Sequence, residues 1–216
     1  MYNAKSFGKI LNENPVVPVV AIENASDALP LCETLVANGI NIIEITLRTN
    51  AAVEAMKSVI DSDLEICVGA GTVCTPEQFK MVENLGVDFV VSPGTTDELI
   101  EYALNSTTSY LPGVMTSSEI LKLRNSGFKF LKLFPATVAG GIKALQAYGS
   151  VYRDVQFCPT GGINRGNFIY YLNLKNVCAV GGTWIAGSQD IIDHNWAQIK
   201  DNVLDVVRKF DSLIKN

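Results

Sequence analysis

The chain is predicted to be an α/β protein, and within that class a closed (β/α)₈ barrel, the TIM barrel. Two kinds of segment alternate along its 216 residues: short runs of β-branched and other apolar residues, and longer segments with helical periodicity. Eight such units follow one another without a linker or a low-complexity stretch. A doubly wound open sheet is the alternative, but the first expected strand lacks the GxGxxG turn of that fold. We expect residues 1–216 to form one domain.

The expected strands are short and bounded by glycine, proline or polar residues. They cover Val16–Ile22, Ile42–Leu47, Glu65–Gly69, Phe89–Ser92, Ser109–Leu111, Phe130–Phe134, Gln156–Cys158 and Cys178–Val180. A short helix is expected before the first strand, and amphipathic periodicity predicts a helix after each strand. These later helices cover Ser26–Ala37, Ala51–Ile60, Pro76–Leu85, Asp97–Asn105, Ser117–Asn125, Ile142–Tyr148, Asn167–Leu172 and Ile191–Ile214.

Local signals support these boundaries. Thr75 precedes Pro76, and Gln78 lies three residues after the threonine, a pattern that predicts an N-cap with a capping box. Glycine follows three of the helical segments, at positions 39, 86 and 127, where a C-terminal cap is expected. Several strands also end in glycine or proline, and these turns lie at the end of a barrel that carries the active site.

The composition argues against several classes of function. Seventeen basic and 22 acidic residues give a formal net charge of −5, and no basic run is present, so we expect no nucleic-acid partner. No apolar stretch approaches the roughly 18 residues that span a bilayer, so we expect no membrane partner. The first residues lack the apolar region of a secretory signal, which predicts a cytoplasmic protein.

Cysteine and histidine usage narrows the chemistry further. The five cysteines show no CxxC spacing and are expected to be reduced thiols that pack as small hydrophobes. His194 is the only histidine, and it is expected to lie on the surface. One histidine cannot supply a multi-histidine metal site, and its position does not suit a Ser-His-Asp triad.

One lysine stands in an otherwise apolar run, Phe130–Pro135. The run predicts a buried strand, and burying an ammonium group is costly, so a lysine in such a place tends to lose its proton. An uncharged amine is a nucleophile that forms Schiff bases with carbonyl compounds. Lys132 is therefore a candidate catalytic residue. The alternative is a lysine whose long side chain reaches the surface from the end of the strand.

Glu44, Thr46 and Arg48 are spaced two residues apart, so a strand directs all three to one face. In a small barrel that face is the interior, where each charge needs a partner or a ligand. Glu44 is suited to proton transfer, and the planar guanidinium of Arg48 is suited to binding a carboxylate. A structural ion pair is the alternative.

Two diglycine turns, Gly161-Gly162 and Gly181-Gly182, follow the last two expected strands. Loops at these positions of a barrel often bind phosphate through backbone N–H groups, because glycine lets the backbone approach an anion closely. Thr72, directly after the third strand, could bind a carboxylate or cap the next turn. Pro93 and Phe134 could line an apolar slot beside the lysine, or simply pack.

The residues around the glutamate and the lysine resemble motifs of a known family. Gly39–Arg48 is similar to the glutamate motif, and Gly127–Ala136 with Gly140 is similar to the Schiff-base lysine motif, of the 2-keto-3-deoxy-6-phosphogluconate / 4-hydroxy-2-oxoglutarate aldolases. The resemblance extends from about Val16 to Ala186. It implies a (β/α)₈ barrel, a metal-free class I aldolase without a cofactor, a phosphorylated keto-acid substrate and a homotrimer.

The resemblance also implies a role for each matching residue. Lys132 forms the imine and Glu44 is the acid and base, while Arg48 and Thr72 hold the pyruvate carboxylate. The remaining positions form the pyruvate pocket (Pro93, Phe134), the aldehyde end (Thr160) and the phosphate pocket (Gly161, Gly162, Gly182, Thr183). Many relatives carry serine where this chain has Thr183. A sister group that cleaves the galactonate epimer carries arginine in its first strand, whereas Val16–Ile22 has none, which favours the gluconate type.

Two rival functions stay open from the sequence alone. A metal- or cofactor-dependent phosphate-binding barrel, such as a phosphosugar isomerase or a thiamin phosphate synthase, would share the diglycine loops but would not need the Glu44 and Lys132 pair. A non-catalytic anion sensor would bind a sugar acid without turnover. The sequence does not rank the phosphorylated six-carbon acid against hydroxyoxoglutarate, since both yield pyruvate through the same imine.

Overall fold

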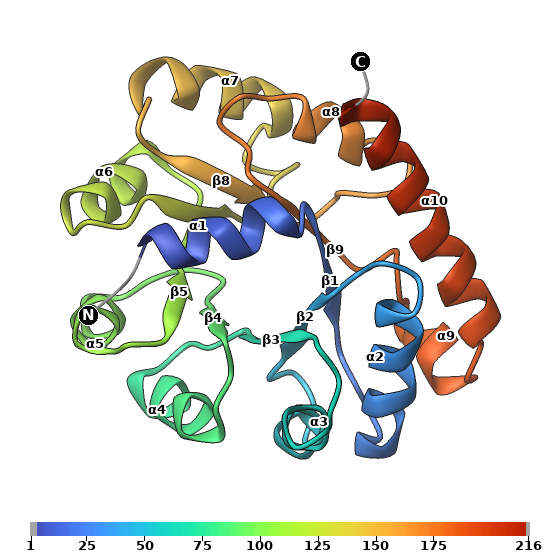
Figure 1. The fold of residues 1–216 in the computed structure, drawn as a ribbon. Coiled ribbons are helices and arrows are strands. Elements are labelled where there is room, and N and C mark those ends of the chain that lie inside the picture. The colour runs from blue at the N-terminus through green and yellow to red at the C-terminus, as the bar shows by residue number, and fades with distance from the viewer. Residues whose placement is uncertain (1–3, 215–216) are drawn as a thin grey trace.

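The computed structural model describes residues 4–214 (Figure 1). Most of its strands form one parallel sheet of six in the order β5-β4-β3-β2-β1-β9, and three more form a second parallel sheet in the order β6-β7-β8. The strands are β1 Val16–Val20, β2 Ile42–Thr46, β3 Cys67–Gly71, β4 Phe89–Val91, β5 Ser109–Leu111, β6 Gly113–Val114, β7 Phe130–Leu133, β8 Gln156–Pro159 and β9 Val180–Gly182.

Helices surround the strands on the outside, and α1 lies across one end of them (Figure 1). The helices are α1 Ala4–Glu13, the 3₁₀ turn η1 Ala25–Asp27, α2 Ala28–Val36, α3 Ala52–Ile60, α4 Pro76–Leu85, α5 Asp97–Asn105, α6 Ser117–Asn125, α7 Gly141–Val151, α8 Phe168–Leu172, α9 Ser188–Ile192 and α10 Trp196–Ile214. Gly8 of α1 packs against Phe130 at the start of β7, so α1 covers the end at which the strands begin.

The expected closed barrel of eight strands is wrong, although the α/β class is confirmed. The six-stranded sheet forms an open half-barrel, and the three-stranded sheet is separate from it in the hydrogen-bonded ladder. The doubly wound alternative does not fit either, because the strand order from β5 to β1 follows the chain without the reversal that defines that fold.

Proline explains both interruptions of the ladder. Pro112 lies between β5 and β6 and has no N–H to donate, so the chain pairs with β4 before this residue and with β7 after it. On the other side, β8 ends at Pro159, and only two isolated bridges connect its surroundings to the next segment, Phe157 with Val177 and Thr160 with Gly181.

Helices with strong local signals begin and end where the sequence predicts. Thr75 caps α4 by accepting a hydrogen bond from the N–H of Gln78, and Gly86 ends the helix with a φ of 93°. Strand boundaries depend on a distant partner and differ more from the prediction. β9 begins two residues later than expected, where it pairs with β1. The expected last helix is divided at His194, which has a φ of 52° and an exposed ring.

The core lies between the strands and the surrounding helices and contains apolar side chains from nearly every element. All five cysteines are free thiols, and only Cys74 is exposed. Within residues 4–214, none of the helices combines the length and the apolar character needed to cross a membrane.

Candidate active site

A cavity of about 250 Å³ lies where the strands end. All eleven residues that the sequence singled out line it: Glu44, Arg48, Thr72, Pro93, Lys132, Phe134, Thr160, Gly161, Gly162, Gly182 and Thr183. They come from the carboxyl ends of β2, β3, β4, β7, β8 and β9, or from the residues that follow these strands. Segments far apart in the chain therefore contribute to one hollow.

The central feature of the cavity is a contact between Lys132 on β7 and Glu44 on β2. Lys132 Nζ lies 3.1 Å from Glu44 Oε1 and 3.5 Å from Oε2. Lys132 is 5% exposed and Glu44 is 3% exposed, so the lysine does not reach the surface. Gly71 makes room for this pair, because a Cβ there would lie 2.3 Å from Glu44 Oε1. The Phe134 ring covers the amine at 5.3 Å from Nζ.

A buried thiol lies beside the pair. Cys158 on β8 is the register partner of Lys132, so the two side chains point to the same side of the small sheet. Burial raises the pKa of the Cys158 thiol to about 12, an effect larger than the opposing attraction of the Lys132 charge. The thiol therefore stays uncharged at neutral pH and does not compete with Glu44 as a base.

Arg48 is held by a short chain of hydrogen bonds. Its Nε donates to Thr46 Oγ1 at 3.0 Å, and the Thr46 hydroxyl in turn donates to the backbone carbonyl of Val20 at 2.8 Å. Thr46 is 1% exposed, so this chain is shielded from water. The guanidinium keeps its terminal nitrogens for a ligand, and these can bind a carboxylate with two parallel hydrogen bonds.

Thr72 has the left-handed backbone conformation, with a φ of 62°, which is uncommon for a residue other than glycine. Capping, the alternative weighed for this hydroxyl, is performed by Thr75 instead. Strained backbone of this kind clusters where a ligand is held. The backbone of Pro93 packs tightly against Gly113. A Cβ at Gly113 would lie only 2.4 Å from the Pro93 backbone.

Gly161 and Gly162, which follow β8, and Gly182, at the end of β9, also line the cavity. Gly161 and Gly162 have φ values of 94° and 79°, which favour glycine, and a Cβ at Gly162 would lie 2.2 Å from Thr137 Oγ1. Within the described chain, no backbone carbonyl accepts from the N–H of Gly162, Ile163 or Thr183. Free N–H groups on glycine-rich turns are suited to binding an anion.

Three further residues line the cavity that the sequence did not single out as site residues: Val19, Thr46 and Ile163. Thr46 carried a signal, because it lies on the strand face of Glu44. Val19 is the register partner of Glu44 on β1, which no local pattern reveals. Ile163 extends a glycine turn, and its sequence context does not distinguish it from a packing residue.

The cavity combines positively charged, negatively charged and hydrogen-bond-donating groups. A buried amine and a carboxylate lie in contact in the cavity wall, and a guanidinium and free backbone N–H groups line the same cavity. This arrangement suits a small molecule with a carbonyl group and negative charge at both ends.

Comparisons with known proteins point to one family. The family model "KDPG and KHG aldolase" matches residues 7–202. The Escherichia coli K12 protein "KHG/KDPG aldolase" is 43% identical over 176 residues, which are 82% of this chain and 83% of that protein. A KDPG aldolase of Legionella pneumophila, solved with pyruvate captured as a covalent carbinolamine intermediate, has a TM-score of 0.89 and 43% identity, covering 91% of this chain and 96% of that one.

A second solved structure is nearly as similar. The 2-keto-3-deoxy-6-phosphogluconate aldolase of Zymomonas mobilis ZM4, solved with 3-phosphoglycerate, has a TM-score of 0.87 and 36% identity over 94% of this chain and 95% of that one. A family model that spans most of the chain and relatives at this level of identity lead to the same conclusion: the chain belongs to the KDPG and KHG aldolase family.

Proposed function

We infer that this chain is a class I aldolase that forms a Schiff base on Lys132. It cleaves 2-keto-3-deoxy-6-phosphogluconate to pyruvate and glyceraldehyde 3-phosphate, 4-hydroxy-2-oxoglutarate to pyruvate and glyoxylate, or both. The observation that carries this inference is the buried contact of 3.1 Å between Lys132 Nζ and Glu44 Oε1 in the wall of the cavity. An ion pair with only a structural role would not need to face a cavity. The covalent carbinolamine of the Legionella relative supports the same chemistry.

Glu44 prepares Lys132 for attack. The amine must be uncharged to act as a nucleophile, and the carboxylate lies close enough to Nζ to accept its proton. The neutral amine adds to the C2 ketone carbon of the substrate, and the former carbonyl oxygen takes up a proton to give a carbinolamine. Loss of that hydroxyl as water leaves a protonated imine on Lys132.

Cleavage follows from the iminium. Glu44, directly or through a water molecule, removes the proton of the C4 hydroxyl, and C4 becomes the carbonyl carbon of the departing aldehyde. The electron pair of the C3–C4 bond moves into the iminium and gives an enamine. Glu44 then returns a proton to C3, and hydrolysis of the imine releases pyruvate and free Lys132. One carboxylate thus serves as both base and acid.

The two ends of the substrate are proposed to bind on opposite sides of this pair. Arg48 and Thr72 hold the carboxylate of the pyruvate part, while Pro93 and Phe134 form its apolar surroundings. Thr160 contacts the aldehyde part and influences its stereochemistry; its Oγ1 is buried and has no hydrogen-bond partner in residues 4–214.

The glycine turns are proposed to bind the phosphate, through the backbone at Gly161, Gly162 and Gly182 and the hydroxyl of Thr183. The free N–H groups described above support this assignment, and so does the relative solved with 3-phosphoglycerate. Fixing both ends holds the C3–C4 bond beside the reacting pair, which lowers the entropic part of the barrier.

We further propose that residues 1–216 act as one aldolase domain, that the chain forms a homotrimer and that it works in the cytoplasm. The trimer is supported by the family resemblance. The five free thiols support a reducing compartment such as the cytoplasm.

Borohydride reduction in the presence of pyruvate should trap the protein covalently, because it converts the imine to a stable secondary amine. Peptide mapping by mass spectrometry should place the adduct on Lys132. Lys132→Met should abolish both trapping and cleavage, whereas Lys143→Met, which changes an exposed lysine, should leave both intact. An adduct on a different lysine would remove Lys132 from the mechanism.

Glu44→Gln should lower kcat by about 100-fold or more, because it removes the acid and base but keeps the size of the side chain. Pyruvate binding, measured by the rate of borohydride trapping at limiting pyruvate, should change far less. Glu54→Gln, an exposed substitution of the same kind on α3, is the matched control. An unchanged kcat would show that another group transfers the proton.

Thr46→Val should raise KM for the keto acid by about tenfold, because Arg48 loses the hydroxyl that accepts from its Nε. The shape of the side chain is retained, so kcat should fall less than KM rises. In an Arg48→Lys background the same substitution should have little further effect, since lysine has no Nε in that position. Equal effects in both backgrounds would contradict the proposed coupling.

Sedimentation equilibrium of the purified chain should give three times the mass of 23.4 kDa. A monomer or a dimer across the working concentration range would refute the trimer.

Fractionation of the source cells should recover the chain with cytoplasmic marker enzymes, and recovery with an extracytoplasmic fraction would refute that location.

A further inference from the structure

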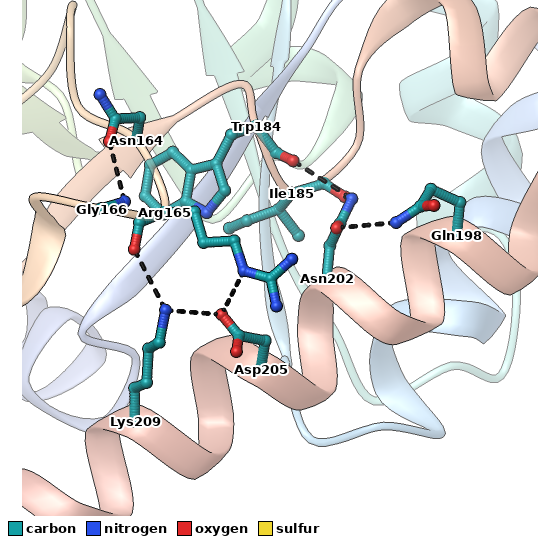
Figure 2. A network of polar contacts seen from close by, with 9 residues as sticks. All are labelled: Asn164, Arg165, Gly166, Trp184, Ile185, Gln198, Asn202, Asp205 and Lys209. Carbon is teal, nitrogen blue, oxygen red and sulfur yellow. Dashed lines mark hydrogen bonds and ion pairs between the residues drawn. The ribbon is translucent and has the colours of Figure 1, made fainter.

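Helix α10 contacts the loop that contains Gly161 and Gly162 and the loop that directly follows Gly182 of β9 (Figure 2). The first loop, residues 160–167, connects β8 to α8, and the second, residues 183–187, connects β9 to α9. They are called here the first and the second glycine loop. Asn202 and Asp205 of α10 do not line the cavity, yet their side chains bind these two loops.

Asn202 holds the second glycine loop. Its Nδ2 donates to the backbone carbonyls of Trp184 and Ile185 at 3.3 and 3.2 Å (Figure 2). Gln198 Nε2 donates to Asn202 Oδ1 at 3.1 Å, which fixes the orientation of the amide. The Trp184 ring lies directly over Gly182, where a Cβ would be 1.6 Å from a ring carbon, so the loop and the end of β9 are packed against each other here.

Asp205 holds the first glycine loop. Its Oδ2 accepts from Arg165 Nε at 2.8 Å and lies 2.9 Å from Lys209 Nζ, which also donates to the Arg165 carbonyl at 3.2 Å (Figure 2). The hydrogen bond from Arg165 is the largest influence on Asp205 and lowers the pKa of its carboxyl group. The side chain of Asp205 is only 12% exposed, which makes this pair stronger than one at the open surface.

Hydrogen bonds within the first glycine loop connect the segment around Arg165 to Gly162. Asn167 Nδ2 donates to the carbonyl of Gly162 at 3.0 Å, and Asn167 Oδ1 accepts from the N–H of Asn164 at 2.8 Å. Asn164 Oδ1 in turn accepts from the N–H of Gly166 at 2.8 Å. Arg165 lies within this closed set of bonds. The Phe168 and Trp184 rings, 5.7 Å apart, connect the two loops.

We propose that Asn202 and Asp205 are positioning residues that set the affinity for the phosphate end of the substrate without taking part in the reaction at Lys132. This rests on the proposed function of the glycine turns. Backbone N–H groups bind an anion well only when several of them converge on it, and small displacements of a preorganised site are costly. Neither loop has a long helix of its own to hold it, since α8 and α9 each contain five residues.

The test compares substrates with and without a phosphate. In Asn202→Leu and Asp205→Asn, KM for 2-keto-3-deoxy-6-phosphogluconate should rise about tenfold while kcat stays within about twofold. Pyruvate has no phosphate, so its borohydride trapping on Lys132 should keep the wild-type rate. Asp211→Asn makes the same chemical change at an exposed position of α10 away from both loops and should leave all values unchanged.

An unchanged KM for the phosphorylated substrate in both variants would overturn the proposal. An equal loss on pyruvate trapping would also overturn it, because that result indicates a general effect on folding. If Asn202→Leu does not fold, Asp205→Asn decides alone, since both of its partner cations are partly exposed and can be solvated. A wild-type protein that neither traps pyruvate nor cleaves either substrate would instead refute the proposed function itself.

Discussion

The buried contact between Lys132 and Glu44 is the constraint on which the rest of the site depends. Two charged groups in an apolar interior are tolerable only while they remain together, and removing one partner typically costs roughly 3–5 kcal/mol. The neighbouring residues accommodate this pair: Gly71 leaves room for the carboxylate, Phe134 covers the amine, and Cys158 stays uncharged. The same closeness that stabilises the pair lets a proton pass between its members, so stability and reactivity have one source.

Around this pair, different strand ends contribute different chemical groups to the cavity. The residues after β2 and β3 provide a cation and a strained backbone, which suit a carboxylate, and the residues that follow β8 and β9 provide free N–H groups. The first strand contributes only an apolar residue, Val19, beside Glu44.

Sequence patterns predicted features that depend on neighbouring residues, such as strand faces and helix caps. They failed for features that depend on the pairing of distant segments. The face shared by Glu44, Thr46 and Arg48 follows from the two-residue period of a strand, and α4 follows from its caps at Thr75 and Gly86. The closed barrel was wrong because an alternating pattern does not show whether neighbouring strands pair, and Pro112 and Pro159 interrupt that pairing. β6 was missed because a strand of two residues after a proline resembles a turn. The left-handed conformation of Thr72 has no signal in its residue type.

The division of the strands into two sheets has a consequence for catalysis. Lys132 belongs to the three-stranded sheet and Glu44 to the six-stranded one, so the amine and the carboxylate lie on opposite sides of a seam that few backbone hydrogen bonds cross. A slight rigid-body slide of one sheet against the other would change the separation of amine and carboxylate without breaking either ladder.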